Sequence, residues 1–271
     1  MTITALFLTR LRQESAILVT VQATRGSAPR EKGAWMAVFA DGFVGTVGGG
    51  HLEFQALAEA RQQLRGGGDE AVKRYALGPS LGQCCGGEVH LCFELVTALD
   101  GAALQRRLAP VRLPVALFGG GHVGQALVRV FGDLPLQVRW IDSRDEIFPA
   151  QVPPNVTCEH SDPVQSAVTG LVSGSRVLIM SFSHAEDLDV VAACLTRQRL
   201  WGDLPFIGLI GSQTKWATFR HRLDARGYLP QELAQVTCPI GVPGIVGKAP
   251  EVIAVAVAAQ LLQSWPTCKT G

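Results

Sequence analysis

Apolar residues in the first part of the chain follow patterns typical of strands. Short apolar runs predict strands at residues 16–22, 35–40 and 43–47, and Asp41-Gly42 between the last two is a strong hairpin signal. A helix is predicted to follow the triple glycine at 48–50 and to end at Gly66. These elements predict an N-terminal α+β domain.

Residues 88–96 alternate between apolar and polar positions, which predicts a half-buried strand. The side chains expected on its buried face are Val89, Leu91, Phe93 and Leu95. Residues 97–114 then lose this periodicity and gather arginine and proline, so we expect an interdomain connection there. The N-terminal domain is predicted to cover residues 1–110.

Strands and helices alternate after this connection. The predicted strands are 115–118, 137–141, 176–182 and 206–210, and the predicted helices run to about 131, over 188–197, from about 215, and over 250–263. Such alternation predicts a parallel sheet. The fold class is therefore α/β, with a C-terminal Rossmann-like parallel sheet domain over residues 111–271 after the N-terminal α+β domain.

Composition narrows the function classes. The 24 basic and 23 acidic residues give a net charge of +1, which argues against nucleic acid or an anionic membrane as a partner. The N-terminus lacks a signal-peptide pattern, and no apolar run is long enough for a membrane span, so a cytoplasmic location is expected. The 7 cysteines are mostly scattered, which favours reduced thiols over a disulfide framework.

A glycine-rich turn follows the first strand of the C-terminal domain. Gly119, Gly121 and Gly124 have the GxGxxG spacing, which permits a tight turn, close approach of a phosphate and close packing of the next helix. These glycines, with His122 among them, are candidate cofactor-binding residues. Asp142 ends the second strand, where such folds place a carboxylate against a ribose hydroxyl. The alternatives are an ordinary strand-to-helix turn and an aspartate that caps a loop.

Other candidate residues also follow predicted strands. Ligands of parallel sheets bind beyond the carboxyl ends of the strands, which draws attention to Arg144, His184 and Lys215. Arg144 is a candidate for stacking on a base, and Lys215 for opening a second anion site. His184 lies three positions before Asp187, which suggests a histidine held by a carboxylate. Solvated side chains are the plainer alternative for each.

The N-terminal domain offers a second group of candidates. Gly48, Gly49 and Gly50 precede a helix, where free amides favour an anion, although a glycine turn needed for packing is equally compatible. The loop before the strand at 88–96 holds Cys84 and Cys85, followed by Gly86 and Gly87. A thiolate there would bind a soft metal, with Cys85 the stronger candidate and Cys84 an inert loop cysteine. The spacing does not make a zinc site.

Seven motifs along the chain together resemble the xanthine dehydrogenase accessory protein family, of the XdhC/CoxI type. They are TRGSAPREKGAWM, GTVGGGHLE, LGQCCGG, FGGGHVG, IDSR, GLIGSQTK and CPIGVPGIVGKAPEVIA. The resemblance implies a carrier chaperone without catalytic residues. Such a protein binds the molybdenum cofactor, holds it during sulfuration by a cysteine desulfurase and inserts it into the molybdenum subunit of an apo xanthine dehydrogenase or a related hydroxylase. One departure is Phe182, where the family often has a histidine that pairs with the one at 184.

The residues suit this cargo. Molybdopterin carries a phosphate, a pterin and a dithiolene-bound metal, so amide nests for anions and a nearby thiolate are the groups a carrier needs. We expect the cofactor between the domains, with Gly48–Gly50 and Cys85 on one wall and Gly119–Gly124 on the other. In this hypothesis Cys85 contacts the molybdenum. A separate nucleotide in the Rossmann-like domain and a homodimer are further expectations.

Two other functions compete with this interpretation. An NAD(P)-dependent oxidoreductase would account for GxGxxG together with Asp142, although His184 is the one convincing acid or base candidate in the second domain. A nucleotidyltransferase that acts on the cofactor is the weakest alternative, because the N-terminus has no clear glycine-rich nucleotide loop of that kind.

Overall fold

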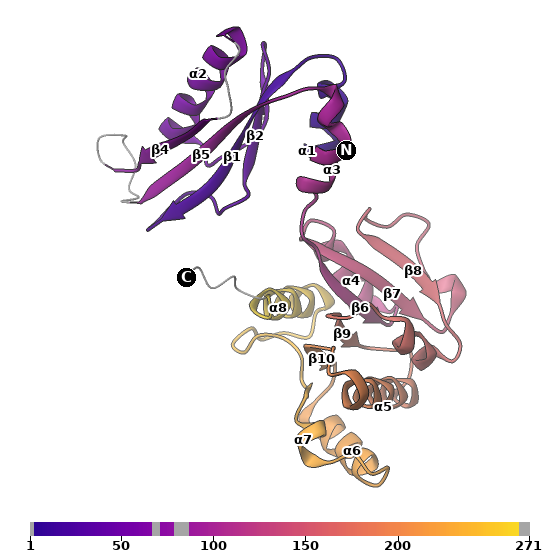
Figure 1. The fold of residues 1–271 in the computed structure, drawn as a ribbon. Coiled ribbons are helices and arrows are strands. Elements are labelled where there is room, and N and C mark those ends of the chain that lie inside the picture. The colour runs from indigo at the N-terminus through magenta and orange to yellow at the C-terminus, as the bar shows by residue number, and fades with distance from the viewer. Residues whose placement is uncertain (1–2, 67–70, 79–86, 266–271) are drawn as a thin grey trace. The chain divides into compact units, whose positions relative to one another are not determined.

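The computed structural model describes residues 3–66, 71–78 and 87–265. The chain divides into two compact units, Met1–Ala109 and Pro110–Gly271, each with its own sheet (Figure 1). Each unit is a separate layered structure, and they are described in turn.

An antiparallel sheet of five strands forms the centre of the N-terminal unit, in the order β3-β2-β1-β5-β4. Its strands are β1 (Ala16–Arg25), β2 (Trp35–Val38), β3 (Phe43–Gly45), β4 (Ala71–Ala76) and β5 (Glu88–Val96). The predicted hairpin is confirmed, since Val38 pairs with Phe43 across the Asp41-Gly42 turn. Strand β4 was missed because its apolar and charged residues lie in a half-exposed edge strand.

Helices cover both faces of this sheet. Helix α2 (Gly50–Gly66) packs Leu52, Ala56 and Ala60 into one core cluster. Helices α1 (Ile3–Leu11) and α3 (Gly101–Arg107) contribute to a second cluster on the other face. The alternation predicted for β5 holds at residues 89, 91 and 93, but Leu95 is exposed instead of buried.

The prediction of a long interdomain connection at 97–114 is wrong. Residues Ala98–Asp100 form a 3-10 turn (η2) that leads into α3, and Thr97 and Asp100 form a capping box at its start. Leu104 of α3 is 1% exposed in the N-terminal core. The segment lacks strand periodicity because it is a short helix that buries one side, and the two units divide between Ala109 and Pro110.

A parallel sheet of six strands forms the centre of the C-terminal unit, in the order β11-β10-β9-β6-β7-β8. Its strands are β6 (Leu113–Phe118), β7 (Leu136–Asp142), β8 (Val156–His160), β9 (Arg176–Ile179), β10 (Phe206–Leu209) and β11 (Val236–Thr237). The predicted fold class, a Rossmann-like parallel sheet after an α+β domain, is confirmed.

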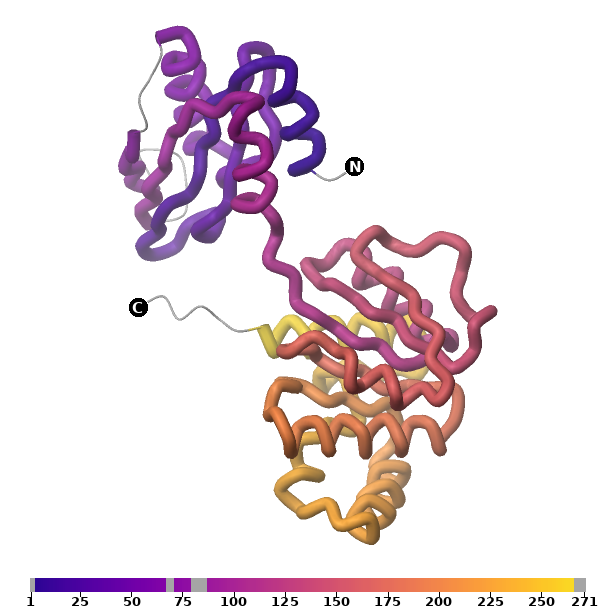
Figure 2. Tube along the Cα trace, turned by 45° about the vertical axis from the view of Figure 1, so that its right-hand side comes forward, coloured from indigo at the N-terminus to yellow at the C-terminus, as the bar shows by residue number. Residues whose placement is uncertain are grey.

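Helices cover both faces of the parallel sheet as well (Figures 1 and 2). Helices α4 (His122–Phe131) and α8 (Pro250–Gln263) pack together against one face. Helices α5 (His184–Trp201), α6 (Gln213–Asp224) and α7 (Pro230–Leu233) belong to the opposite core, with the 3-10 segments η3 (Asp145–Ile147) and η4 (Val164–Gly170) between strands. This layering leaves the carboxyl ends of the strands as the edge where the loops can build a site.

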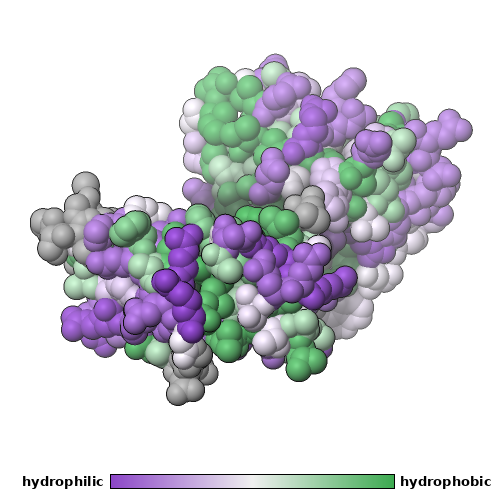
Figure 3. All heavy atoms as spheres, turned by 90° about the horizontal axis from the view of Figure 1, so that it is seen from above, coloured by the Kyte–Doolittle hydropathy of each residue, from purple (hydrophilic) through white to green (hydrophobic). Residues whose placement is uncertain are grey.

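Hydrophilic and hydrophobic side chains both lie on the surface. Figure 3 shows hydrophilic and hydrophobic residues interspersed over the visible face. None of the helices in the described ranges is both long enough and apolar enough to span a membrane.

Leu104 tests the reassignment of residues 97–109 to the N-terminal core. Because its side chain is buried beside Phe7 and Leu11, we expect Leu104→Ala to lower the free energy of unfolding by about 2–5 kcal/mol in calorimetric or urea denaturation. Leu99→Ala is the matched control, since Leu99 is 95% exposed in the same segment and its loss is expected to cost less than about 0.5 kcal/mol. Equal effects of the two changes would contradict the reassignment.

Candidate functional site at the carboxyl edge of the parallel sheet

The strand order reverses between β6 and β9. The chain moves from β6 outward to β7 and β8 on one side, and from β9 outward to β10 and β11 on the other. The last residues of the central pair, Phe118 and Ile179, are in register, and the Met180 amide donates to the Phe118 carbonyl at 2.8 Å. The loops after β6 and β9 therefore lie side by side at the position where ligands of such sheets bind.

Most glycines of the turn after β6 are needed by the fold. Gly119 has a φ of +119°, and a Cβ there would overlap the Met180 carbonyl oxygen. A Cβ on Gly120 would lie 2.7 Å from an Ile147 side-chain carbon, and one on Gly124 would overlap the Gly119 carbonyl oxygen. These three positions exclude side chains whether or not a ligand binds.

Gly121 differs from the other glycines of this turn. Its φ of −69° suits any residue, and a Cβ added there meets nothing within 4 Å. Gly121 is also the N-cap of α4 and supplies no side-chain cap, whereas Ser183 and Ser212 cap α5 and α6 with their hydroxyls. The amides that begin α4 at His122 are therefore open to an external acceptor.

Asp142 is buried within this turn and is 1% exposed. One carboxylate oxygen accepts from the Gly120 amide at 2.6 Å and from Arg144 Nη2 at 3.0 Å, and the other accepts from the Arg144 amide and Nε, each at 2.9 Å. Burial alone would raise the pKa of Asp142, but the hydrogen bonds from Arg144 and Gly120 outweigh it and lower that pKa below its usual value. The predicted role in ribose binding has no support here, because both oxygens serve the turn itself.

Arg144 connects Asp142 to the loop after β9. Its guanidinium carbon lies 4.4 Å from the ring centroid of Phe182, which makes a cation–π contact. The Phe182 amide donates to Glu186 at 3.0 Å, and the other oxygen of Glu186 accepts from the Ser143 hydroxyl at 2.7 Å. The hydrogen bond with Asp142 raises the pKa of Arg144 further above its usual value. The bonds to Asp142 therefore fix the position of the Arg144 guanidinium, and the Phe182 ring stacks against it.

A second ion pair joins the first turns of α5 and α6. Lys215 Nζ lies 2.6 Å from Asp187 and donates to the Ile210 carbonyl at 2.9 Å, and Asp187 also accepts from the Ser181 amide at 2.7 Å. Both side chains are largely buried. Of the two alternatives for His184, a carboxylate partner and a surface position, these contacts favour the second, since both oxygens of Asp187 bind other groups. The Ser181 hydroxyl is buried and has no hydrogen-bond partner within the described ranges.

His184 lines a cavity of about 380 Å³ beside this ion pair. The other lining residues are Ser212, Thr214, Lys215, Thr218, Phe219 and Arg222. The His184 ring meets Phe219 edge-on, with 6.4 Å between the ring centroids. The structure thus brings His184 and Lys215 together, although Lys215 already has an anionic partner.

The glycines before α2 have a partner of their own. Gly48, Gly49 and Gly50 all have positive φ, which explains their identity without a ligand. The Glu53 carboxylate accepts from the Thr46 hydroxyl and from the amides of residue 47 at 3.3 Å and Gly49 at 3.2 Å. An external anion at these amides would compete with Glu53.

The cysteine loop gives a more limited picture. Cys84, Cys85 and Gly86 lie outside the described residues. A Cβ on Gly87 would overlap the Ser27 carbonyl oxygen, so that glycine is needed for close backbone packing. The described chain contains no cluster of three or more His, Cys, Asp or Glu side chains that could hold a metal ion.

Three of the cysteines among the described residues lie in the C-terminal unit. Burial raises the pKa of Cys158 and Cys238, and raises that of Cys194 to about 12. These thiols stay protonated at neutral pH and are poor ligands for a soft metal.

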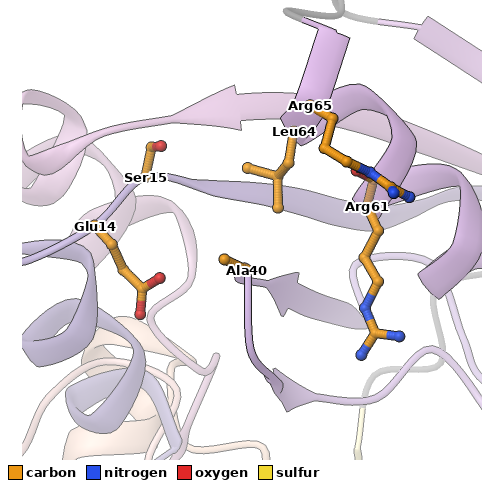
Figure 4. A pocket seen from close by; sticks show the side chains of 6 residues that line it. All are labelled: Glu14, Ser15, Ala40, Arg61, Leu64 and Arg65. Atoms are coloured by element: carbon orange, nitrogen blue, oxygen red, sulfur yellow. The ribbon is translucent and has the colours of Figure 1, made fainter.

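The N-terminal unit contains a larger cavity, of about 530 Å³ (Figure 4). Its lining residues are Glu14, Ser15, Ala40, Arg61, Leu64 and Arg65. The two arginines come from the last turns of α2, and Glu14 accepts from Arg10 at 2.7 Å. Sequence reasoning missed this cavity, because nothing in the spacing of these residues brings them together.

Asp142 provides a test of the turn's electrostatics. Because its folded pKa is lowered, the carboxylate stabilises the fold above the unfolded pKa near 4, and this contribution is lost as pH falls through the lower folded value. We expect Asp142→Asn to lower the free energy of unfolding by about 1–3 kcal/mol at pH 7, and the difference from wild type to shrink below about pH 4. Urea denaturation at several pH values measures both effects, and a pH-independent difference would contradict this account.

Comparison with known proteins places this fold. A family model described as the XdhC Rossmann domain matches residues 115–261, more than half of the chain, and one described as the XdhC and CoxI family matches residues 10–76. The Escherichia coli protein YqeB, which is uncharacterized, is 27% identical over 249 residues. That match covers 89% of this chain but 42% of YqeB, so the chain spans less than half the length of this curated relative.

One solved structure agrees with this architecture over the whole chain. A Bacillus halodurans protein described as a xanthine dehydrogenase superposes with a TM-score of 0.78 at 19% identity, covering 100% of this chain and 97% of that one. A Rossmann-fold NAD(P)-binding family protein from Shigella flexneri covers 55% of this chain and 85% of its own, with 14% identity and a TM-score of 0.40, which is too low to bear on function. The motifs that resembled the XdhC/CoxI family are thus confirmed, and the chain belongs to that family.

Proposed function

We propose that this protein is an accessory carrier that takes part in xanthine dehydrogenase maturation by binding the molybdenum cofactor as cargo. In this role it holds the cofactor during sulfuration and inserts it into apo xanthine dehydrogenase or a related molybdenum hydroxylase. Family membership supports the maturation role. The observation that carries cofactor binding is the open, uncapped turn at Gly121, which suits the phosphate of molybdopterin.

The residues around Gly121 fit a phosphate group. The amides at the start of α4, including that of His122, lack a side-chain cap and lie at the positive end of the helix dipole. Gly119, Gly120 and Gly124 shape the turn through their own packing, so Gly121 is the position left for ligand approach. The nearby carboxylate of Asp142 is paired with Arg144 and opposes an anion less than an unpaired one would.

A carrier role also fits the charged groups at this edge. Asp142 pairs with Arg144, and Asp187 pairs with Lys215, each at hydrogen-bond distance. Paired, buried charges hold loops in place, whereas general acid–base catalysis needs a group poised to exchange a proton with a substrate. This arrangement supports binding and release of cargo over chemical conversion of it.

The partners of this function follow from its steps. A cysteine desulfurase would modify the metal of the held cofactor, and an apo molybdenum subunit would receive it. We further propose a cytoplasmic homodimer, in which a second copy would help to cover the cargo.

The competing function, an NAD(P)-dependent oxidoreductase, rests mainly on Asp142. In that function the carboxylate at the end of the second strand binds the ribose hydroxyls. Here Asp142 is buried and both of its oxygens are used by Gly120 and Arg144. The structure therefore gives the oxidoreductase hypothesis less support than its sequence motif suggested.

Gly121 tests the proposed site directly. We expect Gly121→Val to fold normally, because the added side chain meets no neighbour. The amount of molybdopterin that it retains should fall by about tenfold or more, because the valine side chain blocks the phosphate. The measurement is pterin content after anaerobic loading and gel filtration. Gly101→Val is the matched control, since Gly101 also has open space and negative φ but lies in α3. Equal retention by both folded variants would refute the site.

Cys85 tests the predicted contact with the metal. We expect Cys85→Ala to lose molybdenum during gel filtration faster than wild type, because a thiolate ligand is removed. Cys158→Ala is the control, since burial keeps the Cys158 thiol protonated. Unchanged molybdenum content and unchanged delivery to the apo-enzyme would remove Cys85 from the site.

A further inference from the structure

An exposed aromatic side chain, that of Phe182, lies in the loop between β9 and α5, near the strand reversal. Phe182 follows β9 by three residues and is 65% exposed. Singly exposed apolar residues are common, so the exposure alone does not mark a site. What distinguishes Phe182 is the set of contacts that hold it, together with its place near the strand reversal.

Contacts with Arg144 and Glu186 hold Phe182 in place. The Arg144 guanidinium lies against its ring with the guanidinium carbon 4.4 Å from the centroid, and Arg144 is itself bonded through two nitrogens to buried Asp142. The Phe182 amide donates to Glu186. The Phe182 ring and the Arg144 guanidinium thus form a stack, and the guanidinium is anchored by buried Asp142. Much of the entropy cost of ordering such a surface is met before a ligand arrives.

The stack lies beside the open turn at Gly121. Phe118 at the end of β6 is paired in register with Ile179 at the end of β9, and adjacent strands are about 4.8 Å apart. Gly121 follows the first of these residues by three positions, and Phe182 follows the second by three. The turn and the stack also share a partner, because the Gly120 amide and Arg144 Nη2 donate to the same oxygen of Asp142.

We propose that Phe182, supported by Arg144, is a stacking platform for the fused heteroaromatic ring of a phosphorylated ligand bound at Gly121. The inference deepens the proposed function, on which it rests, by assigning the ring end of the ligand to a residue. The shared chemistry is a flat, electron-delocalised ring system with a phosphate, as in a pterin or a purine nucleotide.

A similar stack elsewhere in the same unit provides a control. Arg197 lies over the Trp201 ring with its guanidinium carbon 5.0 Å from the centroid, and Trp201 is 59% exposed. Phe182 precedes the first residue of α5 by two positions, whereas Trp201 is the last residue of that helix. The 18 residues of α5 separate the two stacks by about 27 Å. Trp201 thus reproduces the chemistry of the platform far from the open turn.

The experiment measures the dissociation constants of neopterin phosphate and AMP by calorimetry. We expect Phe182→Ala to weaken binding of the preferred probe by about tenfold or more, because stacking contributes that much, and Phe182→Trp to retain it. Trp201→Ala should bind like wild type. Denaturation midpoints of all variants establish that each is folded, and Phe182→Leu separates loss of the flat ring from loss of apolar bulk, with weakened binding expected.

The outcomes separate the platform from the site. If Gly121→Val weakens binding and Phe182→Ala stays within twofold of wild type, the site stands and the platform is refuted. If neither change affects binding, both the site and the platform are wrong. A wild-type protein that binds neither probe overturns the inference as stated, whereas molybdopterin retention still tests the proposed function separately. The preferred probe identifies the ring as pterin or purine.

Discussion

The buried carboxylate of Asp142 organises the carboxyl edge of the parallel sheet. A carboxylate that is 1% exposed is stable only when its oxygens are satisfied, and here Gly120 and Arg144 donate four hydrogen bonds to it. The first fixes the glycine turn after β6. The others fix Arg144, and through it the stack with Phe182. One buried charge therefore sets the geometry of loops that follow two different strands.

The glycines of the turn at this edge have different structural reasons for being glycine. Three glycines of the turn are explained by atoms of the protein that a side chain would displace, and Gly121 is not. The spacing GxGxxG does not tell a glycine needed for packing from one needed for ligand approach, because both requirements select glycine. The distinction depends on which Cβ positions are occupied by neighbouring atoms, and it identifies Gly121 as the position at which a substitution tests the proposed site without disturbing the packing.

Much of the architecture was predictable from the sequence. The β-α alternation after residue 115 predicted the parallel sheet, and Asp41-Gly42 predicted a hairpin. The missed elements lack a strong period: β8 buries Val156 alone among its residues, and β11 has two residues. Helix α1 was not predicted, because it has nine residues and buries two of them, Phe7 and Leu11, which is too short a pattern to show a helical period.

The candidate site was less predictable because its partners are distant in sequence. Parallel-sheet topology correctly directed attention to Asp142, His184 and Lys215, since loops after neighbouring strands must converge. The pairing of Asp187 with Lys215, 28 positions apart, depends on how α5 and α6 begin, which no local pattern specifies. By contrast, Glu53 lies four residues after Gly49, so a carboxylate in the first turn of α2 was a readable sign that the glycine amides already had an acceptor.

The Asp142–Arg144 pair also bears on what the turn can bind. A lone carboxylate hydrogen-bonded to Gly120 would repel a phosphate placed one residue further along, as the proposed site requires. Arg144 neutralises the carboxylate through two nitrogens and leaves the dipole of α4 as the local field. In the proposed site one arginine would serve both ends of the ligand, since the guanidinium that pairs with Asp142 also lies against the Phe182 ring.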